Sequence, residues 1–321
     1  MKKRISVVTP CYNEEENVEP LYQAIREIMA GFPQYDYDHL YVDNCSTDGT
    51  LAILKRLASE DLRVRVIVNA RNFGHIRSPY HGLLQADGDA VIYMASDFQD
   101  PPDLIPRFIK EWEAGSKMVI GIKSESQESP VLYAIRTAYY RFIANLSDTQ
   151  LNENSTGFGL YDRVVIETLR KIDDPYPYFR GLVSEIGFEP ARVEFNQPRR
   201  PRGITKNNFF TLYDIAMLGI IKHTKVPLRL ATMMGFVLSF FSLLIAAAYL
   251  VYKLLFWDRF SAGLAPVVIG LFLFSSVQLF FIGILGEYVG VILTHVRRLP
   301  LVVEKERVNF KTQQASTPEQ S

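Results

Sequence analysis

Side chains able to hold a metal ion follow an apolar run near position 95. The run 91–94 is typical of a buried strand, and Asp97 and Gln99 follow it two residues apart. An extended backbone can aim both side-chain oxygens at one ion. The carboxyl end of a buried strand is also where an α/β sheet places a divalent metal and the phosphates that it neutralises. Pro101 and Pro102 would end the strand and begin a helix. The alternative is an ordinary polar turn.

Polar side chains also follow two other strand-like runs. Asn13, Glu14 and Glu15 come after the run 5–9, and a polar segment that begins at Asp43 follows the run 39–42. Three such ends meeting at one edge of a sheet predict a nucleotide pocket. Helix caps or plain loop contacts are the alternative for each residue taken alone.

The segments that must position these residues alternate along the chain between strand-like and helix-like patterns. Alternation of this kind predicts crossover units and an α/β fold with a mostly parallel sheet flanked by helices. The expected strands are 5–9, 39–42, 64–68, 90–94 and 118–122, and the expected helices are 18–30, 51–58, 78–85 and 104–113.

The composition adds a membrane segment to this sheet. The chain has 321 residues, 48% of them hydrophobic, and the uncharged runs 230–252 and 261–286 each exceed the roughly 20 apolar residues that cross a bilayer. A buried helical hairpin in a soluble domain is the alternative. With 35 basic and 35 acidic residues, the formal net charge of zero argues against a nucleic-acid partner.

Basic residues indicate the orientation of the two runs. They are concentrated before the first run and after the second, which predicts a multi-pass protein of the inner (plasma) membrane with both termini in the cytoplasm. No signal peptide is expected, so Cys11 and Cys45 should be reduced packing residues. The flanking basic residues are Lys222, Lys225, Arg229, Arg297, Arg298, Lys305 and Arg307.

Three regions follow from these patterns. We expect a cytosolic domain over 1–226, a transmembrane hairpin over 227–296 with helices at about 230–252 and 262–288, and a cytosolic tail over 297–321. Segments 130–146 and 209–221 are amphipathic and predict helices at the membrane interface, although ordinary surface helices fit 130–146 equally well.

Six short motifs resemble, in order and spacing, the family 2 inverting glycosyltransferases with a GT-A-like fold. More narrowly they are similar to the polyprenyl-phosphate sugar transferases related to dolichol-phosphate mannose synthase, in the bacterial subgroup with two membrane helices. The motifs are PCYNEEEN at 10–17, VDNCSTDGT at 42–50, RNFG at 71–74, DFQDPP at 97–102, FRGL at 179–182 and GITK at 203–206.

The resemblance implies a role for each motif. Mg²⁺ or Mn²⁺ would be held by Asp97 and Gln99 and would stabilise the leaving diphosphate of a nucleotide-sugar donor. Lys206, with Arg202, would lie against phosphate oxygens, so that Asp97 and Lys206 are the expected catalytic residues. The nucleotide would be lined by Pro10, Tyr12, Glu14, Asp43 and Asn72.

The implied acceptor is a polyprenyl phosphate of the undecaprenyl type, used in cell-envelope glycan assembly. Its phosphate is largely a dianion at cytosolic pH and is already nucleophilic, so no general base is required. Catalysis then consists of holding acceptor and donor in line and stabilising the leaving group. Arg136, Arg141 and Arg202 are the predicted contacts for the acceptor phosphate. A homo-oligomer in the membrane is left open.

Four positions depart from the family pattern. Ala95 and Asn44 stand where acids are usual, His75 replaces a common lysine, and segment 156–160 lacks its usual acid and arginine. These departures favour a different donor sugar, a weaker metal site or lost activity, in that order. Two alternatives therefore stay open: a binding protein without chemistry, and a processive polysaccharide synthase. Against the latter, neither Trp112 nor Trp257 follows an arginine.

Overall fold

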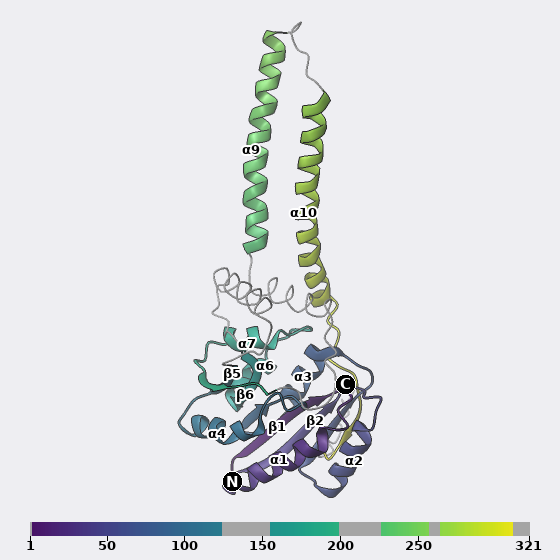
Figure 1. The fold of residues 1–321 in the computed structure, drawn as a ribbon, viewed down its shortest axis with the longest axis vertical. Coiled ribbons are helices and arrows are strands. Elements are labelled where there is room, and N and C mark those ends of the chain that lie inside the picture. The colour runs from purple at the N-terminus through teal and green to yellow at the C-terminus, as the bar shows by residue number, and fades with distance from the viewer. Residues whose placement is uncertain (1, 124–154, 199–225, 257–263, 311–321) are drawn as a thin grey trace, which may run out of the picture.

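The computed structural model describes residues 2–123, 155–198, 226–256 and 264–310 (Figure 1). The strands are β1 (Arg4–Cys11), β2 (Asp36–Asp43), β3 (Val64–Asn69), β4 (Ala90–Tyr93), β5 (Met118–Lys123), β6 (Ser155–Asp162), β7 (Ala191–Phe195) and β8 (Glu304–Val308). The helices are α1 (Val18–Ala30), α2 (Thr50–Glu60), α3 (Gly74–Gln85), the 3-10 turn η1 (Pro102–Leu104), α4 (Ile105–Glu113), α6 (Arg163–Arg170), α7 (Phe179–Glu185), α9 (Val226–Leu255) and α10 (Leu264–Val296).

One sheet joins these strands in the order β7-β5-β6-β4-β1-β2-β3-β8. The pairs β1–β2, β1–β4, β2–β3 and β5–β7 are parallel, which confirms the predicted α/β sheet and its five expected strands. The chain moves outward from β1 through β2 to β3 and then returns to place β4 on the other side of β1. This reversal creates a switch point between β1 and β4, where the loops after the two strands diverge and leave room for a ligand.

Helices cover both faces of the sheet because the strand side chains alternate. Ile5 and Val7 of β1 face a core built with α1 and α4, whereas Val8 faces a core built with α3, α6 and α7. Every one of these three side chains is 0% exposed. Burial of aliphatic side chains on both faces is what a central parallel strand requires.

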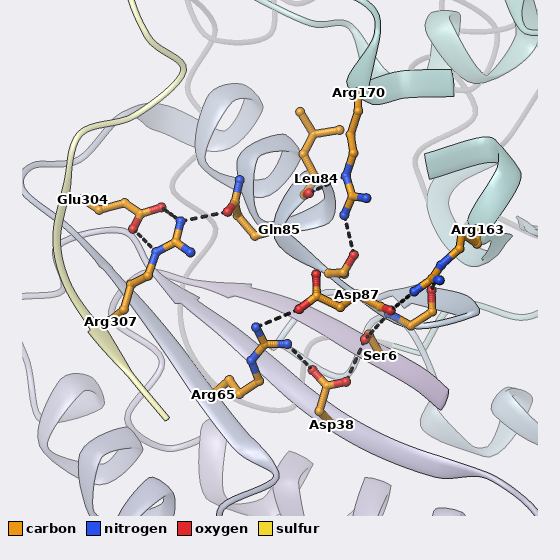
Figure 2. A network of polar contacts seen from close by, with 12 residues as sticks. Ser6, Asp38, Arg65, Leu84, Gln85, Asp87, Arg163, Arg170, Glu304 and Arg307 are labelled. Carbon is orange, nitrogen blue, oxygen red and sulfur yellow. Dashed lines mark hydrogen bonds and ion pairs between the residues drawn. The ribbon is translucent and has the colours of Figure 1, made fainter. Parts of the chain in front are cut away.

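A polar network crosses the amino ends of the central strands (Figure 2). Arg65 forms ion pairs at 3.1 Å with both Asp38 and Asp87, and Asp38 accepts a 2.7 Å hydrogen bond from Ser6. Arg170 of α6 donates to the backbone oxygens of Leu84 and Ala86 at the end of α3. The charged groups at this end therefore hold strands and helices to one another.

The strand β8 returns to the sheet from the far end of the chain. It runs antiparallel to β3, and its Arg307 donates to Gln85 at 2.8 Å (Figure 2). Lys55 and Glu306 form an exposed ion pair at 2.6 Å. Residues 304–308, expected to lie in a separate tail, thus complete the same sheet as the amino-terminal strands.

Two long helices, α9 and α10, run side by side and extend away from the α7 side of the sheet (Figure 1). Among the described residues, one stretch, Gly270–Val296, is long and apolar enough to cross a bilayer, and none of its apolar window is buried. The apolar part of α9, Leu230–Ile245, is shorter. The predicted helices 130–146 and 209–221 lie outside the described residues.

Candidate active site

The loops after β1 and β2 are hydrogen-bonded into one unit. The register sets Cys11 beside Asp43, and Asn13, with a positive φ of 56°, turns its side chain to the second loop. The Asn13 Oδ1 accepts the backbone N–H of Thr47 at 2.7 Å, and the Asn13 N–H donates to the Ser46 hydroxyl at 3.0 Å. These two hydrogen bonds fix the backbone at Asn13, between Tyr12 and Glu14.

The predicted nucleotide residues lie along this unit at different depths. Pro10, Tyr12 and Glu14 are half-buried, while Asp43 is 0% exposed. The Asp43 oxygens accept the Ser46 N–H at 3.3 Å, and burial raises the pKa of its carboxyl despite that bond. Asp43 therefore supports the turn at 45–46 in this structure, and its contact with a nucleotide stays a prediction.

The loop after β3 is fastened to the second loop by Asn44. Its side-chain Nδ2 donates to Oδ1 of Asn72 at 2.9 Å and to the backbone oxygen of Gly74 at 3.3 Å. Its Oδ1 accepts from the backbone N–H of Phe73 at 2.9 Å. Gly74 adopts a φ of +84°, which a side chain would strain. Asn72, predicted to line the donor, is exposed on this fastened loop.

The predicted metal residues lie in a tight turn after β4. Asp97 and Gln99 are half-buried, and the N–H of Gln99 donates to the Asp97 Oδ1 at 3.2 Å. Phe98 between them has a positive φ of 59°. The turn starts where the Met94 N–H bonds to the oxygen of Val8 at 3.1 Å, so it lies at the same sheet edge as the first two loops.

Asp100 is a site residue that the sequence analysis did not single out. Its side chain is 5% exposed, and its Oδ2 accepts the backbone N–H of Ala95 at 2.8 Å. Burial, then the charge of Asp100, raises the pKa of Tyr93, and Asp97 acts in the same direction. The charges of both carboxylates thus act on the Tyr93 phenol. The signal was the second acid of the DFQDPP motif.

Oxygen donors at this turn suit a hard divalent cation, since Asp97 and Asp100 supply carboxylates and Gln99 an amide oxygen. Within the described ranges, no group of three or more His, Cys, Asp or Glu side chains is arranged to hold a metal. The donor set fits Mg²⁺ or Mn²⁺ only with further oxygens, such as those of a diphosphate.

Arg180 is a second residue whose position the sequence did not reveal. It lies in α7 and lines a pocket of ≈ 130 Å³ together with His75 and Tyr93. Desolvation, followed by the Arg180 charge, lowers the pKa of His75. His75, noted for replacing a lysine, thus lies beside a cation supplied by another element.

The structure describes the two cysteines but none of the predicted phosphate contacts. Cys11 is a core residue, 3% exposed, as predicted, and burial raises its thiol pKa well above the usual value; Cys45 is half-buried. The predicted phosphate contacts Arg136, Arg141, Arg202 and Lys206 lie outside the described residues.

The amino ends of the strands also border a hollow, of ≈ 1590 Å³. Its walls include Arg65, Asp38 and Asp87, which pair with one another. No loop that follows β1, β2 or β4 reaches it, so the switch point at the opposite edge is the better candidate for chemistry.

Comparison with known families identifies the family of the chain. A family model described as "Glycosyl transferase family 2" matches residues 6–170, a span that contains the loops after β1, β2, β3 and β4. The chain belongs to glycosyl transferase family 2. This membership confirms the resemblance found in the motifs and makes the protein a glycosyltransferase.

Relatives in the family match nearly the whole chain. The SfII prophage-derived bactoprenol glucosyl transferase of Shigella flexneri is 31% identical over 304 residues, which are 94% of this chain and 98% of the relative. An uncharacterized glycosyltransferase of Bacillus subtilis, YkcC, is 31% identical over 300 residues, covering 93% and 92% of the two chains. The similarity to these relatives therefore extends well beyond residue 170, into α9 and α10.

Among solved structures, glucosyl-3-phosphoglycerate synthase from Mycobacterium tuberculosis, in complex with Mn²⁺, uridine diphosphate and phosphoglyceric acid, is similar with a TM-score of 0.48. The match has 19% sequence identity and covers 68% of this chain and 76% of that one.

Proposed function

We propose that this family 2 glycosyltransferase moves a single glycosyl group from a nucleotide sugar to a polyprenyl phosphate at the cytosolic membrane face, with inversion. The observation that carries the proposal is the gathering of the loops after β1, β2 and β4 at the switch point, in a chain similar over 94% of its length to a bactoprenol glucosyl transferase.

The donor would lie along the joined loops after β1 and β2. Aromatic and carboxylate side chains there match the stacking and hydrogen-bonding needs of a nucleoside. Asn44 holds the loop after β3 against the joined loops after β1 and β2. This restricts the motion of the loop before the donor binds and so lowers the entropy lost on binding. The proposed contacts are Pro10, Tyr12, Glu14, Asp43 and Asn72.

The turn after β4 would hold Mg²⁺ or Mn²⁺ through Asp97 and Gln99. The ion would supply charge stabilisation for the departing nucleoside diphosphate. Asp100 stabilises the turn by accepting the Ala95 N–H. Ala95 itself has no carboxylate, but its backbone is thus bound to one. Lys206 and Arg202, predicted from sequence alone, would add positive charge against phosphate oxygens.

The acceptor phosphate would attack directly. A dianionic phosphate monoester needs no general base, so the protein's tasks are to hold it in line with the donor and to exclude water. Attack opposite to the leaving diphosphate gives inversion at the anomeric carbon. Arg136, Arg141 and Arg202 remain the predicted acceptor contacts, and a homo-oligomer remains a prediction.

A two-span arrangement with both termini in the cytoplasm is supported by β8. The chain leaves the sheet domain before α9 and returns after α10 to pair with β3. A strand cannot pair with β3 across a bilayer, so the segment between them crosses the membrane an even number of times. Two crossings would use α10, whose stretch Gly270–Val296 is long and apolar enough, and α9, whose apolar part is shorter. The distribution of basic residues would then set the sheet domain on the cytosolic side.

The test is a donor screen with the full-length protein in detergent and undecaprenyl phosphate. Radiolabelled UDP-, GDP- and dTDP-sugars are supplied with Mn²⁺ or EDTA, and the lipid extract is counted and analysed by mass spectrometry. One added sugar per lipid is expected from a matching donor. A polymer would favour the processive synthase, and donor binding without turnover would favour the binding protein.

A further inference from the structure

The small pocket beside Arg180 has two chemical faces. Its walls are mostly aliphatic and aromatic, from Ile76, Pro79 and Leu83 of α3 and from Phe179 of α7. Arg180 adds a guanidinium at the same pocket. A group that satisfies both faces carries a negative charge next to a short apolar segment.

The position of Arg180 is fixed by its neighbour. The Phe179 ring contacts the rings of Tyr161, Tyr93 and Tyr80, with centroids 5.2, 5.8 and 6.3 Å away. Three aromatic contacts hold the first turn of α7 against β4, β6 and α3. The guanidinium that follows is thus presented on a rigid element, which lowers the entropy lost when it binds an anion.

Arg180 is available to a ligand. Its side chain is exposed, and among the described residues none forms an ion pair with it. Arg180 lines the same pocket as Tyr93, the last residue of β4. An anion held by Arg180 would therefore lie next to the turn that follows β4.

The pocket also lies on the side of the domain that meets the long helices. Asp174, shortly before α7, lies 3.4 Å from His295 near the end of α10. Arg77 of α3 donates to the backbone oxygen of Pro300, just past α10. Helix α3 and the segment before α7 are thus attached to the end of α10 and to the residues that follow it (Figure 1). If the pair spans the bilayer, this is the headgroup level.

We infer that this pocket binds the reactive end of the prenyl phosphate acceptor, with Arg180 on the phosphate and the apolar walls around the first isoprene unit. A volume of ≈ 130 Å³ leaves room for a small apolar group such as one isoprene unit. The inference rests on the proposed function and adds to it a pocket built from α3 and α7.

Calorimetry without donor tests the pocket separately from catalysis. Citronellyl phosphate, citronellol and inorganic phosphate are titrated into the full-length protein in detergent. We expect citronellyl phosphate to bind more tightly than either of the others. Arg180→Ala should weaken its binding about tenfold to a hundredfold, the usual effect of losing a hydrogen-bonded charge, and Arg180→Lys should restore part of the loss.

Two further variants separate the two faces. Ile76→Phe, which fills the apolar part, should weaken citronellyl phosphate but leave inorganic phosphate unchanged. Arg26→Ala removes an exposed arginine of α1, a helix that contributes nothing to the pocket, and should match the wild type. Unchanged citronellyl phosphate binding in Arg180→Ala would overturn the inference.

Steady-state transfer distinguishes the pocket from the function itself. In Arg180→Ala the acceptor KM should rise about tenfold or more while the donor KM stays within about twofold. An equal rise of the donor KM would assign the pocket to the donor and overturn the inference. Arg180-dependent binding of citronellyl phosphate in a protein that transfers no sugar would leave the pocket standing and defeat the proposed function.

Discussion

The side-chain amide of Asn44 donates a 2.9 Å hydrogen bond to Oδ1 of Asn72, joining the loops after β2 and β3. Asn44 stands where the family usually has a second acid. A carboxylate could accept from Phe73 N–H as Asn44 does, but it has no hydrogen to donate to Asn72 or to the oxygen of Gly74. The departure thus has a structural reason, because in this chain Asn44 forms hydrogen bonds to the loop after β3.

Asn44→Asp should therefore loosen the loop that carries Asn72. The variant loses two donated bonds and sets a carboxylate against two oxygen acceptors, which should lower the free energy of unfolding by about 1–3 kcal/mol. We expect the donor KM to rise about tenfold. The acceptor KM is the internal control and should not change. A variant with wild-type donor KM and stability would contradict the role given to Asn44.

His39 should make the protein less stable in mild acid. Its ring is 1% exposed, lies 3.9 Å from the Tyr41 ring, and has a pKa lowered by burial to about 3. The unfolded chain binds the proton below about pH 6.5 and the folded chain does not, so stability falls as the pH drops from about 6.5 toward 3. At pH 5 the loss from this group is about 2 kcal/mol.

Thermal unfolding in detergent, measured from pH 7.5 to 5, checks this sign. His39→Gln cannot titrate, so its stability should fall less steeply than that of the wild type over this range. The gap between the two proteins should narrow as the pH falls. Parallel curves would show that His39 has the same pKa in the folded and unfolded chains, which would contradict the lowered pKa.

Metal removal should stop transfer. EDTA should abolish activity and added Mn²⁺ or Mg²⁺ should restore it, because Asp97 and Gln99 offer oxygen ligands at the carboxyl edge. Gln99→Leu should raise the Mn²⁺ concentration needed for half-maximal rate about tenfold, the loss expected for about 1.4 kcal/mol. Gln23→Leu, on the exposed side of α1, is the matched control. Full activity in EDTA would remove the ion from the mechanism.

Labelling in intact cells tests the two-span arrangement. Phe256 directly follows α9 and Leu299 follows α10, and both side chains are exposed. In a Cys45→Ser background, Phe256→Cys should react with a membrane-impermeant maleimide from outside, whereas Leu299→Cys should react only after permeabilisation. Cys11 is too buried to interfere. Reaction of both variants from the same side would contradict two crossings.

The parts of the fold that have strong periodicity were predictable. Helix α1 was predicted with both ends correct, because its buried positions recur at helical spacing: Val18, Leu21, Tyr22, Ile25 and Met29. The first five strands were found within a few residues because their apolar runs end in turn residues.

Other elements depend on partners that are distant in sequence. Strand β8 has the sequence EKERV, with no apolar alternation, and becomes a strand because its backbone pairs with β3. Helix α3 begins at Gly74 rather than at the predicted position 78. The Gly74 N–H bonds to Oδ1 of Asn72, which Asn44 holds in place. Such side-chain contacts carry no local sequence signal.

The candidate site also contains residues that the sequence predicted and residues that it did not. Asp97, Gln99 and the nucleotide residues were predictable because they belong to motifs at strand ends. Asp100 and Arg180 were quoted within motifs but received no role, since their positions depend on the turn at Ala95 and on the aromatic contacts of Phe179.

Transfer by Asp97→Asn tests the central claim most directly. Wild type and variant are given the matching nucleotide sugar, Mn²⁺ and undecaprenyl phosphate, and the glycosylated lipid is quantified by mass spectrometry. Asp103→Asn, an exposed acid in the turn η1 that follows, is the matched control. We expect one sugar per lipid from the wild type and the control, and a loss of about a thousandfold or more in Asp97→Asn. Near-normal transfer by Asp97→Asn, or none by the wild type from any nucleotide sugar, would contradict the account.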